Sequence, residues 1–333
     1  MMNGVVQVKA GMHSRGWDEV LPVLPPNLEK MISRLPDHIL TRLEEIRLRR
    51  DRPLVLGAGG QDFFLRRDGQ SDSIPESAYI TSGDDMEKVI HNISGSSIYA
   101  LEEELRNGYI TLPGGHRVGL TGRAVLENGQ VKTLKYLSGL NIRIGREIKG
   151  TAASLLPRLL DQAAANIHHT VIFSPPRCGK TTLLRDLVRL ASSGVPQLNY
   201  PGRTVGLVDE RSEIAGCYRG VPQMDVGVRT DVLDGCPKAQ GMMMLLRSMS
   251  PDIIVTDEIG KMEDITALEE VFNAGVRIIV TIHASSMREL TNRPALKYLL
   301  QLNIIQRFVL LGRSRGVGTV EKILYGNEIL PRR

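Results

Sequence analysis

The segment Val171–Thr182, which reads VIFSPPRCGKTT, constrains the fold and the chemistry of this chain more than any other. An apolar run with the composition of a β-strand is followed by a tight loop that ends in Gly-Lys-Thr-Thr. This is the pattern of a P-loop, in which backbone N–H groups and the positive end of the following helix bind phosphate oxygens. The segment therefore predicts a strand, a phosphate-binding loop and a helix in direct succession.

The residue types of this loop suit a nucleoside triphosphate with Mg²⁺, so we predict ATP and Mg²⁺ as ligands. Lys180 is expected to reach the β- and γ-phosphates, and Thr181 to place its hydroxyl on the metal ion. One residue departs from the G-x-x-x-x-G-K-[ST] motif, because Ser174 stands where the motif has its first glycine. The predicted nucleotide-binding residues are Ser174, Pro175, Pro176, Arg177, Cys178, Gly179, Lys180, Thr181 and Thr182.

The segment after the loop has the periodicity of an amphipathic helix. Between Thr182 and Ser193, leucines recur at positions 183, 184, 187 and 190, which is the stripe of a helix packed on a sheet. A strand before the loop and a helix after it are the context that a P-loop requires, whereas Gly-Lys-Thr-Thr alone could occur in a loop by chance.

A second apolar strand is predicted within Pro251–Gly260, and it ends in Asp257 and Glu258. In P-loop ATPases a carboxylate at the end of such a strand holds Mg²⁺, and an adjacent one can polarise the attacking water. We therefore predict Asp257 as a metal ligand and Glu258 as the general base. The alternative is an acidic pair that only marks the exit of a strand, which is a common arrangement.

Two more buried strands are predicted, and both end in polar residues. One precedes Asp209, Glu210 and Arg211, and the other ends in His283. Because the carboxyl ends of strands in an open parallel sheet line one crevice, these residues are expected to converge with the P-loop. Glu210 and His283 are candidate catalytic residues, with His283 sensing the γ-phosphate, although a lone histidine after an apolar strand is more often a capping or core residue.

The order of these segments carries a resemblance. The chain resembles the type II and type IV secretion ATPases, whose Walker A, Asp, Walker B and His boxes come in the same order. The matching segments are the P-loop, the acidic segment, LLRSMSPDIIVTDEIG and TIHASS. More narrowly, three longer segments resemble the stage III sporulation protein AA family of endospore-forming bacteria. They are RTDVLDGCPKAQGMMMLLRSMSPDIIVTDEIG, EEIRLRRDRP and LRNGYITLPGGHRVGLTGRAV. The resemblance implies an α/β protein with a RecA-like ATPase domain behind a smaller N-terminal α+β domain. It also implies a homo-oligomeric ring, with six subunits expected, that serves a membrane channel between mother cell and forespore.

The N-terminal half has the pattern of a separate α+β domain. Alternating apolar and basic residues predict strands, and hairpin turns are predicted at Pro113–Gly115 and at Asn128-Gly129. We place the boundary at Gly150, which gives domains 1–150 and 151–333. The segment Thr151–Ala165 is then expected to be the first helix of the ATPase domain.

Arginines are candidates for completing the site. Ring ATPases often use an arginine from a neighbouring domain or subunit to neutralise charge on the γ-phosphate. Arg123 and Arg143, in strand-like segments of the N-terminal half, are candidate catalytic residues of this kind, although most charged strand residues are simply solvated. Arg211 and Arg229 are candidate phosphate or switch contacts within the ATPase half.

Composition limits the remaining possibilities. The 333 residues carry a net charge of +5, but only 4% are aromatic, too few for a base-stacking platform, so no nucleic acid partner is expected. Three cysteines form no disulfide or zinc pattern, which favours a reducing cytoplasm. No apolar run reaches the roughly 20 residues of a membrane span, so membrane association is expected to be peripheral. The resemblance to the sporulation family implies the mother-cell side. A nucleic-acid-dependent motor and a nucleotide-gated scaffold remain alternatives to a secretion-like motor.

Overall fold

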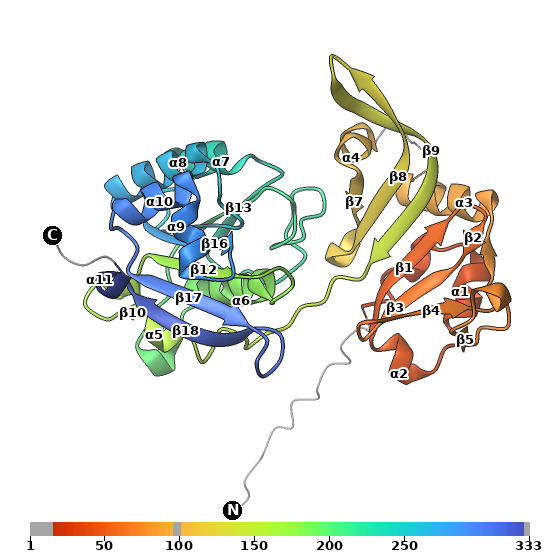
Figure 1. Ribbon diagram of the computed structural model, residues 1–333, viewed down its shortest axis with the longest axis horizontal. Helices are drawn as coiled ribbons and strands as arrows, with labels where there is room; N and C mark the ends of the chain where they lie inside the picture. Colours follow the sequence, from red (N-terminus) through yellow and green to blue (C-terminus); the bar gives the residue numbers. More distant parts are fainter. Residues whose placement is uncertain (1–15, 96–100, 330–333) are drawn as a thin grey trace, which may run out of the picture. The chain divides into compact units, whose positions relative to one another are not determined.

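Two seven-stranded sheets, one in each of two compact units, form the frame of the protein (Figure 1). The computed structural model describes residues 16–95 and 101–329. The units are Met1–Arg146 and Glu147–Arg333, and each has its own apolar core. No helix in the described residues is both long enough and apolar enough to cross a membrane.

The sheet of the first unit is antiparallel, with the strand order β5-β4-β3-β1-β9-β8-β7. A small second sheet pairs β2 with β6. The strands are β1 (Leu43–Arg49), β2 (Arg52–Pro53), β3 (Val55–Ala58), β4 (Gln61–Leu65), β5 (Ser71–Asp72), β6 (Ile80–Thr81), β7 (Tyr109–Thr111), β8 (Arg117–Glu127) and β9 (Gln130–Arg143). The helices are α1 (Pro26–Ile32), α2 (Asp37–Leu40), α3 (Gly83–Ser94) and α4 (Glu102–Asn107).

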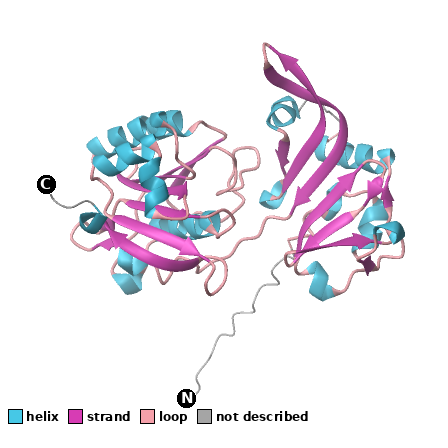
Figure 2. Cartoon of the chain, viewed as in Figure 1, coloured by secondary structure: helices cyan, strands magenta, loops and turns pink. Residues whose placement is uncertain are grey.

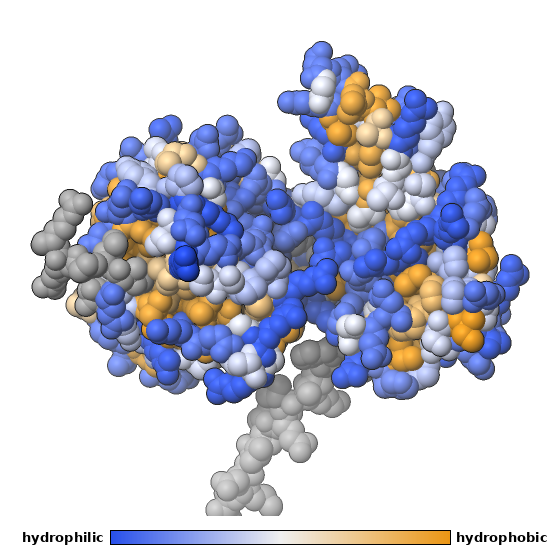
Figure 3. Space-filling model, viewed as in Figure 1, coloured by the Kyte–Doolittle hydropathy of each residue, from blue (hydrophilic) through white to orange (hydrophobic). Residues whose placement is uncertain are grey.

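The β8–β9 hairpin turns where the sequence predicts it. Asn128 and Gly129 both have positive φ, 53° and 76°, as a two-residue hairpin turn of the mirror-image type requires. The turn predicted at Pro113–Gly115 is also confirmed, because it joins the antiparallel pair β7 and β8. Apolar side chains lie exposed on the projecting part of the hairpin (Figure 3), among them Leu126, Val131 and Tyr136.

The sheet of the second unit has the order β14-β13-β15-β16-β12-β17-β18 and is parallel except for β18. Its strands are β12 (Thr170–Ser174), β13 (Val205–Asp209), β14 (Thr230–Asp234), β15 (Ile253–Thr256), β16 (Arg277–His283), β17 (Arg307–Gly312) and β18 (Thr319–Tyr325). The four strands predicted to carry the site, β13, β15, β16 and β12, lie side by side. The expectation that their carboxyl ends meet at one edge is therefore confirmed.

Helices cover both faces of this parallel sheet (Figure 2). Successive residues of β12 point to opposite faces, so that Ile172 packs with α6 while Val171 and Phe173 pack with the helices of the other face. The helices of the first face are α5 (Leu156–Leu159) and α6 (Lys180–Ser193); those of the second are α7 (Lys238–Ser248), α8 (Met262–Asn273), α9 (Met287–Asn292) and α10 (Pro294–Gln301). The unit ends with α11 (Gly326–Ile329).

The helix expected over Thr151–Ala165 is wrong in extent, because only α5 (Leu156–Leu159) is helical. Pro157 lacks an N–H group and fits only the first turn of a helix, which prevents a helix from running through it. After α5 the chain forms the short antiparallel pair β10 (Leu160–Asp161) and β11 (Asn166–Ile167). Burial of Leu160 and Ile167 in the core favours this pair over a longer helix.

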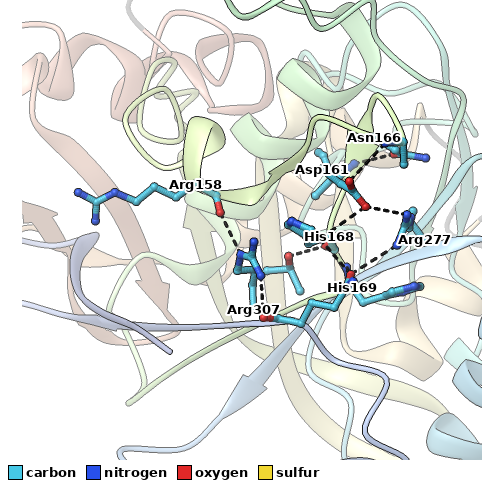
Figure 4. A network of polar contacts seen from close by, with 11 residues as sticks. Arg158, Asp161, Asn166, His168, His169, Arg277 and Arg307 are labelled. Atoms are coloured by element: carbon cyan, nitrogen blue, oxygen red, sulfur yellow. Dashed lines mark hydrogen bonds and ion pairs between the residues drawn. The ribbon is translucent and has the colours of Figure 1, made fainter. Parts of the chain in front are cut away.

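A polar network closes the edge of the sheet opposite the P-loop, where β12, β16 and β17 begin (Figure 4). The Asp161 carboxylate accepts a hydrogen bond from Arg277 at 3.0 Å, and this bond ties β10 to β16. The Gln306 side-chain oxygen accepts from the backbone N–H of His169 at 3.0 Å. The Arg307 guanidinium donates to the carbonyl of Arg158 at 3.1 Å. The network therefore fixes the amino ends of three strands.

His169 is the buried member of this network, and the described residues offer no partner for its Nδ1 atom. Its ring lies edge-on to Phe272, with centroids 5.1 Å apart. Burial, followed by the charge of Arg277, lowers the pKa of His169 to about 4. The folded protein therefore keeps this imidazole neutral under conditions in which the unfolded chain binds a proton.

We predict that His169 makes the protein less stable as the pH falls below about 6.5. The unfolded state then binds more protons than the folded state, which costs about 2 kcal/mol at pH 5. Between pH 7 and pH 5, the free energy of unfolding of His169→Gln should fall less than that of the wild type, by about that amount. Urea unfolding at the two pH values measures this difference. The control variant replaces the exposed His38 with glutamine. Equal pH dependence of His169→Gln and the wild type would contradict the prediction.

Candidate active site

The P-loop connects the end of β12 to the start of α6, as predicted from its sequence. Within it, Arg177 and Gly179 have positive φ, 59° and 83°. A Cβ atom on Gly179 would also lie 3.1 Å from the Val317 side chain, so glycine is needed there for both reasons. Ser174 is not in the left-handed region, which explains how serine replaces the first glycine of the motif without backbone strain.

The loop presents unpaired backbone donors. Among the described residues, none accepts a hydrogen bond from the backbone N–H groups of Gly179, Lys180 or Thr181. These groups lie at the N-terminal end of the 14-residue helix α6, where the helix dipole favours negative charge. The loop therefore fits phosphate oxygens.

The Lys180 side chain is buried at 6% exposure and is held by the end of β12. Its ammonium donates to the Ser174 hydroxyl at 3.1 Å and to the Ser174 and Pro175 carbonyls at 3.3 and 3.4 Å. It also lies 2.8 Å from Nδ1 of His283. Burial lowers the pKa of Lys180, while the negative charge of Glu258 acts in the opposite direction.

His283 joins Lys180 to Glu258. Its Nε2 atom lies 2.6 Å from a carboxylate oxygen of Glu258. An ammonium can only donate, so Nδ1 of His283 must accept from Lys180 and Nε2 must carry the proton that is donated to Glu258. The structure thus brings together Lys180, His283 and Glu258 from three separate segments of the sequence, with His283 as a neutral imidazole of defined tautomer.

Glu258 has an unusual backbone. Its φ is 46°, in the left-handed region that a residue with a side chain rarely adopts. The hydroxyl of Thr281 on β16 accepts a hydrogen bond from the Glu258 N–H at 2.9 Å and so holds this conformation. The second carboxylate oxygen of Glu258 lies 3.5 Å from the guanidinium of Arg211. Strain of this kind is often found where a side chain must be aimed at a substrate.

Asp257 has the environment of a metal ligand. It is 4% exposed, and no group among the described residues donates a hydrogen bond to its carboxylate. Burial, with the charge of Asp209 next in importance, raises the pKa of Asp257 to about 7. No set of three or more metal-binding side chains occurs in the described part of the chain. Mg²⁺ commonly uses one or two protein oxygens with phosphates and water, so Asp257 and the Thr181 hydroxyl fit this ion.

We predict that Asp257→Asn stabilises the metal-free protein above pH 7. The folded state keeps Asp257 protonated up to about pH 7 whereas the unfolded chain releases the proton near pH 4, so folding loses up to about 4 kcal/mol as the pH rises through this window. Asparagine removes this loss. Urea unfolding in EDTA should show a gain of about 4 kcal/mol for the variant at pH 8 that falls to about 1 kcal/mol at pH 4.5, and an equal or lower stability at pH 8 would refute the prediction.

The acidic residues at the end of β13 have different environments. Asp209 is fully buried and accepts hydrogen bonds from the backbone N–H groups of Glu213, Ile214 and Ala215 at 2.8 to 2.9 Å, so it shapes the loop that follows. Glu210 forms an ion pair with Lys238.

Lys238, at the start of α7, is a residue that the sequence interpretation missed. It is 8% exposed, and besides pairing with Glu210 its charge acts to lower the pKa of Asp257. A lysine in the first turn of a helix opposes the helix dipole, and this unusual position was the available signal.

Three of the candidate arginines do not contact the P-loop residues or Glu258 in the described part of the chain. Arg229 donates to the carbonyl of Ser192 at the C-terminal end of α6, so its expected role as a phosphate contact is not supported. Arg123 and Arg143 belong to the first unit, on β8 and β9. Arg123 is exposed, and Arg143 lies 3.7 Å from Glu45.

The first unit also contains a hollow of about 1030 Å³, between α3, α4 and the β8–β9 hairpin. Its lining combines charged residues, such as Arg50 and Glu87, with apolar ones such as Met86. None of the predicted site residues lines it.

Comparisons with known proteins identify the family of this chain. A family model described as "Sporulation stage III, protein AA" matches residues 15–329. Stage III sporulation protein AA of Bacillus subtilis (strain 168) is 45% identical over 306 residues, which is 92% of this chain and 94% of that protein.

Two solved structures share the fold. The ATPase DotB of Legionella pneumophila aligns with a TM-score of 0.51 and 17% identity, over 80% of this chain and 72% of that one. The pilus retraction motor PilT with bound ADP aligns with a TM-score of 0.50 and 14% identity, over 80% and 74%. The predicted α/β fold with a RecA-like domain is confirmed.

Proposed function

Because the chain belongs to the stage III sporulation protein AA family, we propose that it is a Mg²⁺-dependent ATPase that works as a motor subunit of a secretion-like channel complex between mother cell and forespore. One observation carries the proposal. The contacts from Lys180 through His283 to Glu258 link the P-loop to a candidate general base. An acidic pair that merely marked a strand exit would not need such a link.

Each residue has a defined task in the proposed reaction. Backbone N–H groups of the P-loop and the Lys180 ammonium bind the β- and γ-phosphates. Mg²⁺, held by Thr181 and Asp257, would neutralise negative charge on the same phosphates. Glu258 accepts a proton from water as the water oxygen bonds to the γ-phosphorus, and the bond from phosphorus to the β,γ-bridging oxygen breaks to release ADP.

His283 couples occupancy of the P-loop to the base. While Lys180 donates to Nδ1, the Nε2–H group holds one oxygen of Glu258. A triphosphate that draws the ammonium towards itself weakens the first contact and frees the imidazole to turn. Glu258 is then released to orient water, and so hydrolysis begins only when nucleotide is bound. Glu210 is a further candidate catalytic carboxylate, because it pairs with Lys238, whose charge also acts on Asp257.

The proposal includes a homo-oligomeric ring, of six subunits, in which Arg123 or Arg143 of one subunit completes the site of another. The ring would dock on membrane proteins of the channel from the mother-cell side, as a peripheral assembly without nucleic acid. The domain boundary proposed at residue 150 suits this arrangement, because it assigns the arginines and the P-loop to different domains of the chain.

Completion in trans predicts that hydrolysis per subunit rises with protein concentration. An arginine supplied to the γ-phosphate is worth about 10³- to 10⁵-fold in rate. Mixing Lys180→Ala subunits with Arg123→Ala or Arg143→Ala subunits should restore part of the activity, because some sites then combine an intact pocket with an intact arginine. A specific activity that stays flat from dilute to concentrated protein would argue for a self-sufficient subunit.

Two other functions use the same fold, namely a nucleic-acid-dependent motor and a nucleotide-gated scaffold that scarcely turns over. Measuring ATP hydrolysis with and without single-stranded DNA separates the three. The proposed motor hydrolyses ATP at a rate that DNA does not change. Strong stimulation by DNA would favour the nucleic-acid motor, and tight ATP binding without turnover at any protein concentration would favour the scaffold.

A further inference from the structure

The connection between β17 and β18, residues 313–318 and here called the 313–318 loop, lies directly against the P-loop. The Gly318 N–H donates to the carbonyl of Cys178 at 3.1 Å, and the Arg313 guanidinium donates to the carbonyl of Arg177. Val317 approaches so closely that a Cβ on Gly179 would meet its side chain at 3.1 Å. Two loops far apart in sequence are thus joined by hydrogen bonds and by packing.

A residue of β18, the strand that follows the 313–318 loop, also holds this loop in place. The Ser314 backbone N–H and hydroxyl both donate to the Glu321 carboxylate, at 3.0 and 2.8 Å. Val317 nevertheless remains 66% exposed. An apolar side chain is therefore fixed at the rim of a phosphate-binding loop with most of its surface uncovered.

The order of strands decides which end of a nucleotide lies on this side. The strands that end next to Asp257, Glu258 and His283 are β15 and β16, on one side of β12, while β17 and β18 lie on the other side (Figure 1). A nucleoside triphosphate is a linear molecule, and its γ-phosphate must face Glu258 for hydrolysis. Its base and ribose then extend towards the β17–β18 side.

We propose that Val317 is the contact for the nucleobase, whose apolar face packs against this side chain when the phosphates occupy the P-loop. This inference rests on the proposed function and adds a subsite to it. The base has a flat apolar face, and covering a valine side chain with such a face removes apolar area from water. The hydrogen bonds to Cys178 and Arg177 keep the valine at a constant distance from the phosphates.

Binding of ATP and of inorganic tripolyphosphate, which lacks base and ribose, separates this contact from the P-loop. Isothermal titration of the full-length protein with each ligand and Mg²⁺ gives the two affinities. Val317→Ser should weaken ATP binding by about 5- to 10-fold, the effect of one or two uncovered methyl groups, and leave tripolyphosphate within about 2-fold of the wild type. The substitution is at an exposed position, so the protein should fold normally.

Val228→Ser is the matched control. Val228 is 82% exposed. Its neighbour Gly227 packs against Arg189 and Ser192, and its other neighbour, Arg229, donates to the carbonyl of Ser192. Val228 therefore lies near the C-terminal end of α6, at the opposite end of this helix from the P-loop. It should change neither affinity. Unchanged ATP binding in Val317→Ser, or equal weakening of both ligands, overturns the base contact while the P-loop assignment stands. Failure of the wild type to bind either ligand overturns the proposed function together with this inference.

Discussion

Glu258→Gln should lower steady-state ATP hydrolysis by about 10²- to 10⁴-fold while ATP still binds, since this is the usual effect of losing a general base. The amide keeps the shape of the side chain, and its oxygen can still accept the hydrogen bond from Nε2 of His283, which lies 2.6 Å from the carboxylate in the structure. It cannot, however, accept the proton of the attacking water. Phosphate release measures the rate, and equilibrium titration with ATP measures binding.

Glu263→Gln is a suitable control for this variant, because Glu263 is an exposed glutamate on α8. It should retain the wild-type rate. If Glu258→Gln loses ATP binding but keeps substantial turnover, the roles given to Asp257 and Glu258 are wrong.

Lys180→Ala should lose tight ATP binding, with an affinity lower by about 10- to 10²-fold. The ammonium is the main side-chain charge that faces the β- and γ-phosphates, and a hydrogen bond to a charged group contributes about 1.5 to 3 kcal/mol. The variant also removes the donor that holds Nδ1 of His283. Titration with ATP is the measurement, and Lys297→Ala, at an exposed lysine of α10, is the control. Wild-type affinity in Lys180→Ala would remove the basis for the P-loop assignment.

The sequence predicted the parts of the fold that depend on local patterns. The strand before the P-loop, helix α6 and the β8–β9 turn each follow from neighbouring residues, because apolar periodicity and turn residues act over a few positions. The meeting of four strand ends was also predictable, since parallel strands share an edge.

Features that depend on distant contacts could not be predicted. Leu160 and Ile167 pair as strands because both are buried in a core that is formed by the whole unit, and an alanine-rich sequence does not show this. Arg229 donates to a carbonyl 37 positions earlier in the chain, which no local pattern reveals. The position of Val317 beside Gly179 likewise depends on β17 pairing with β12. The tautomer of His283 required its two neighbours to be known.

The central claim is that this chain hydrolyses ATP at the site that contains Lys180, His283 and Glu258. Its most direct test is phosphate release from ATP by wild-type protein and Glu258→Gln, purified in parallel and assayed at equal concentration with Mg²⁺ and with EDTA. We predict Mg²⁺-dependent release by the wild type and release at the level of the EDTA control by the variant. Equal release by both proteins, or none by the wild type across a range of concentrations that allows rings to form, would contradict the claim.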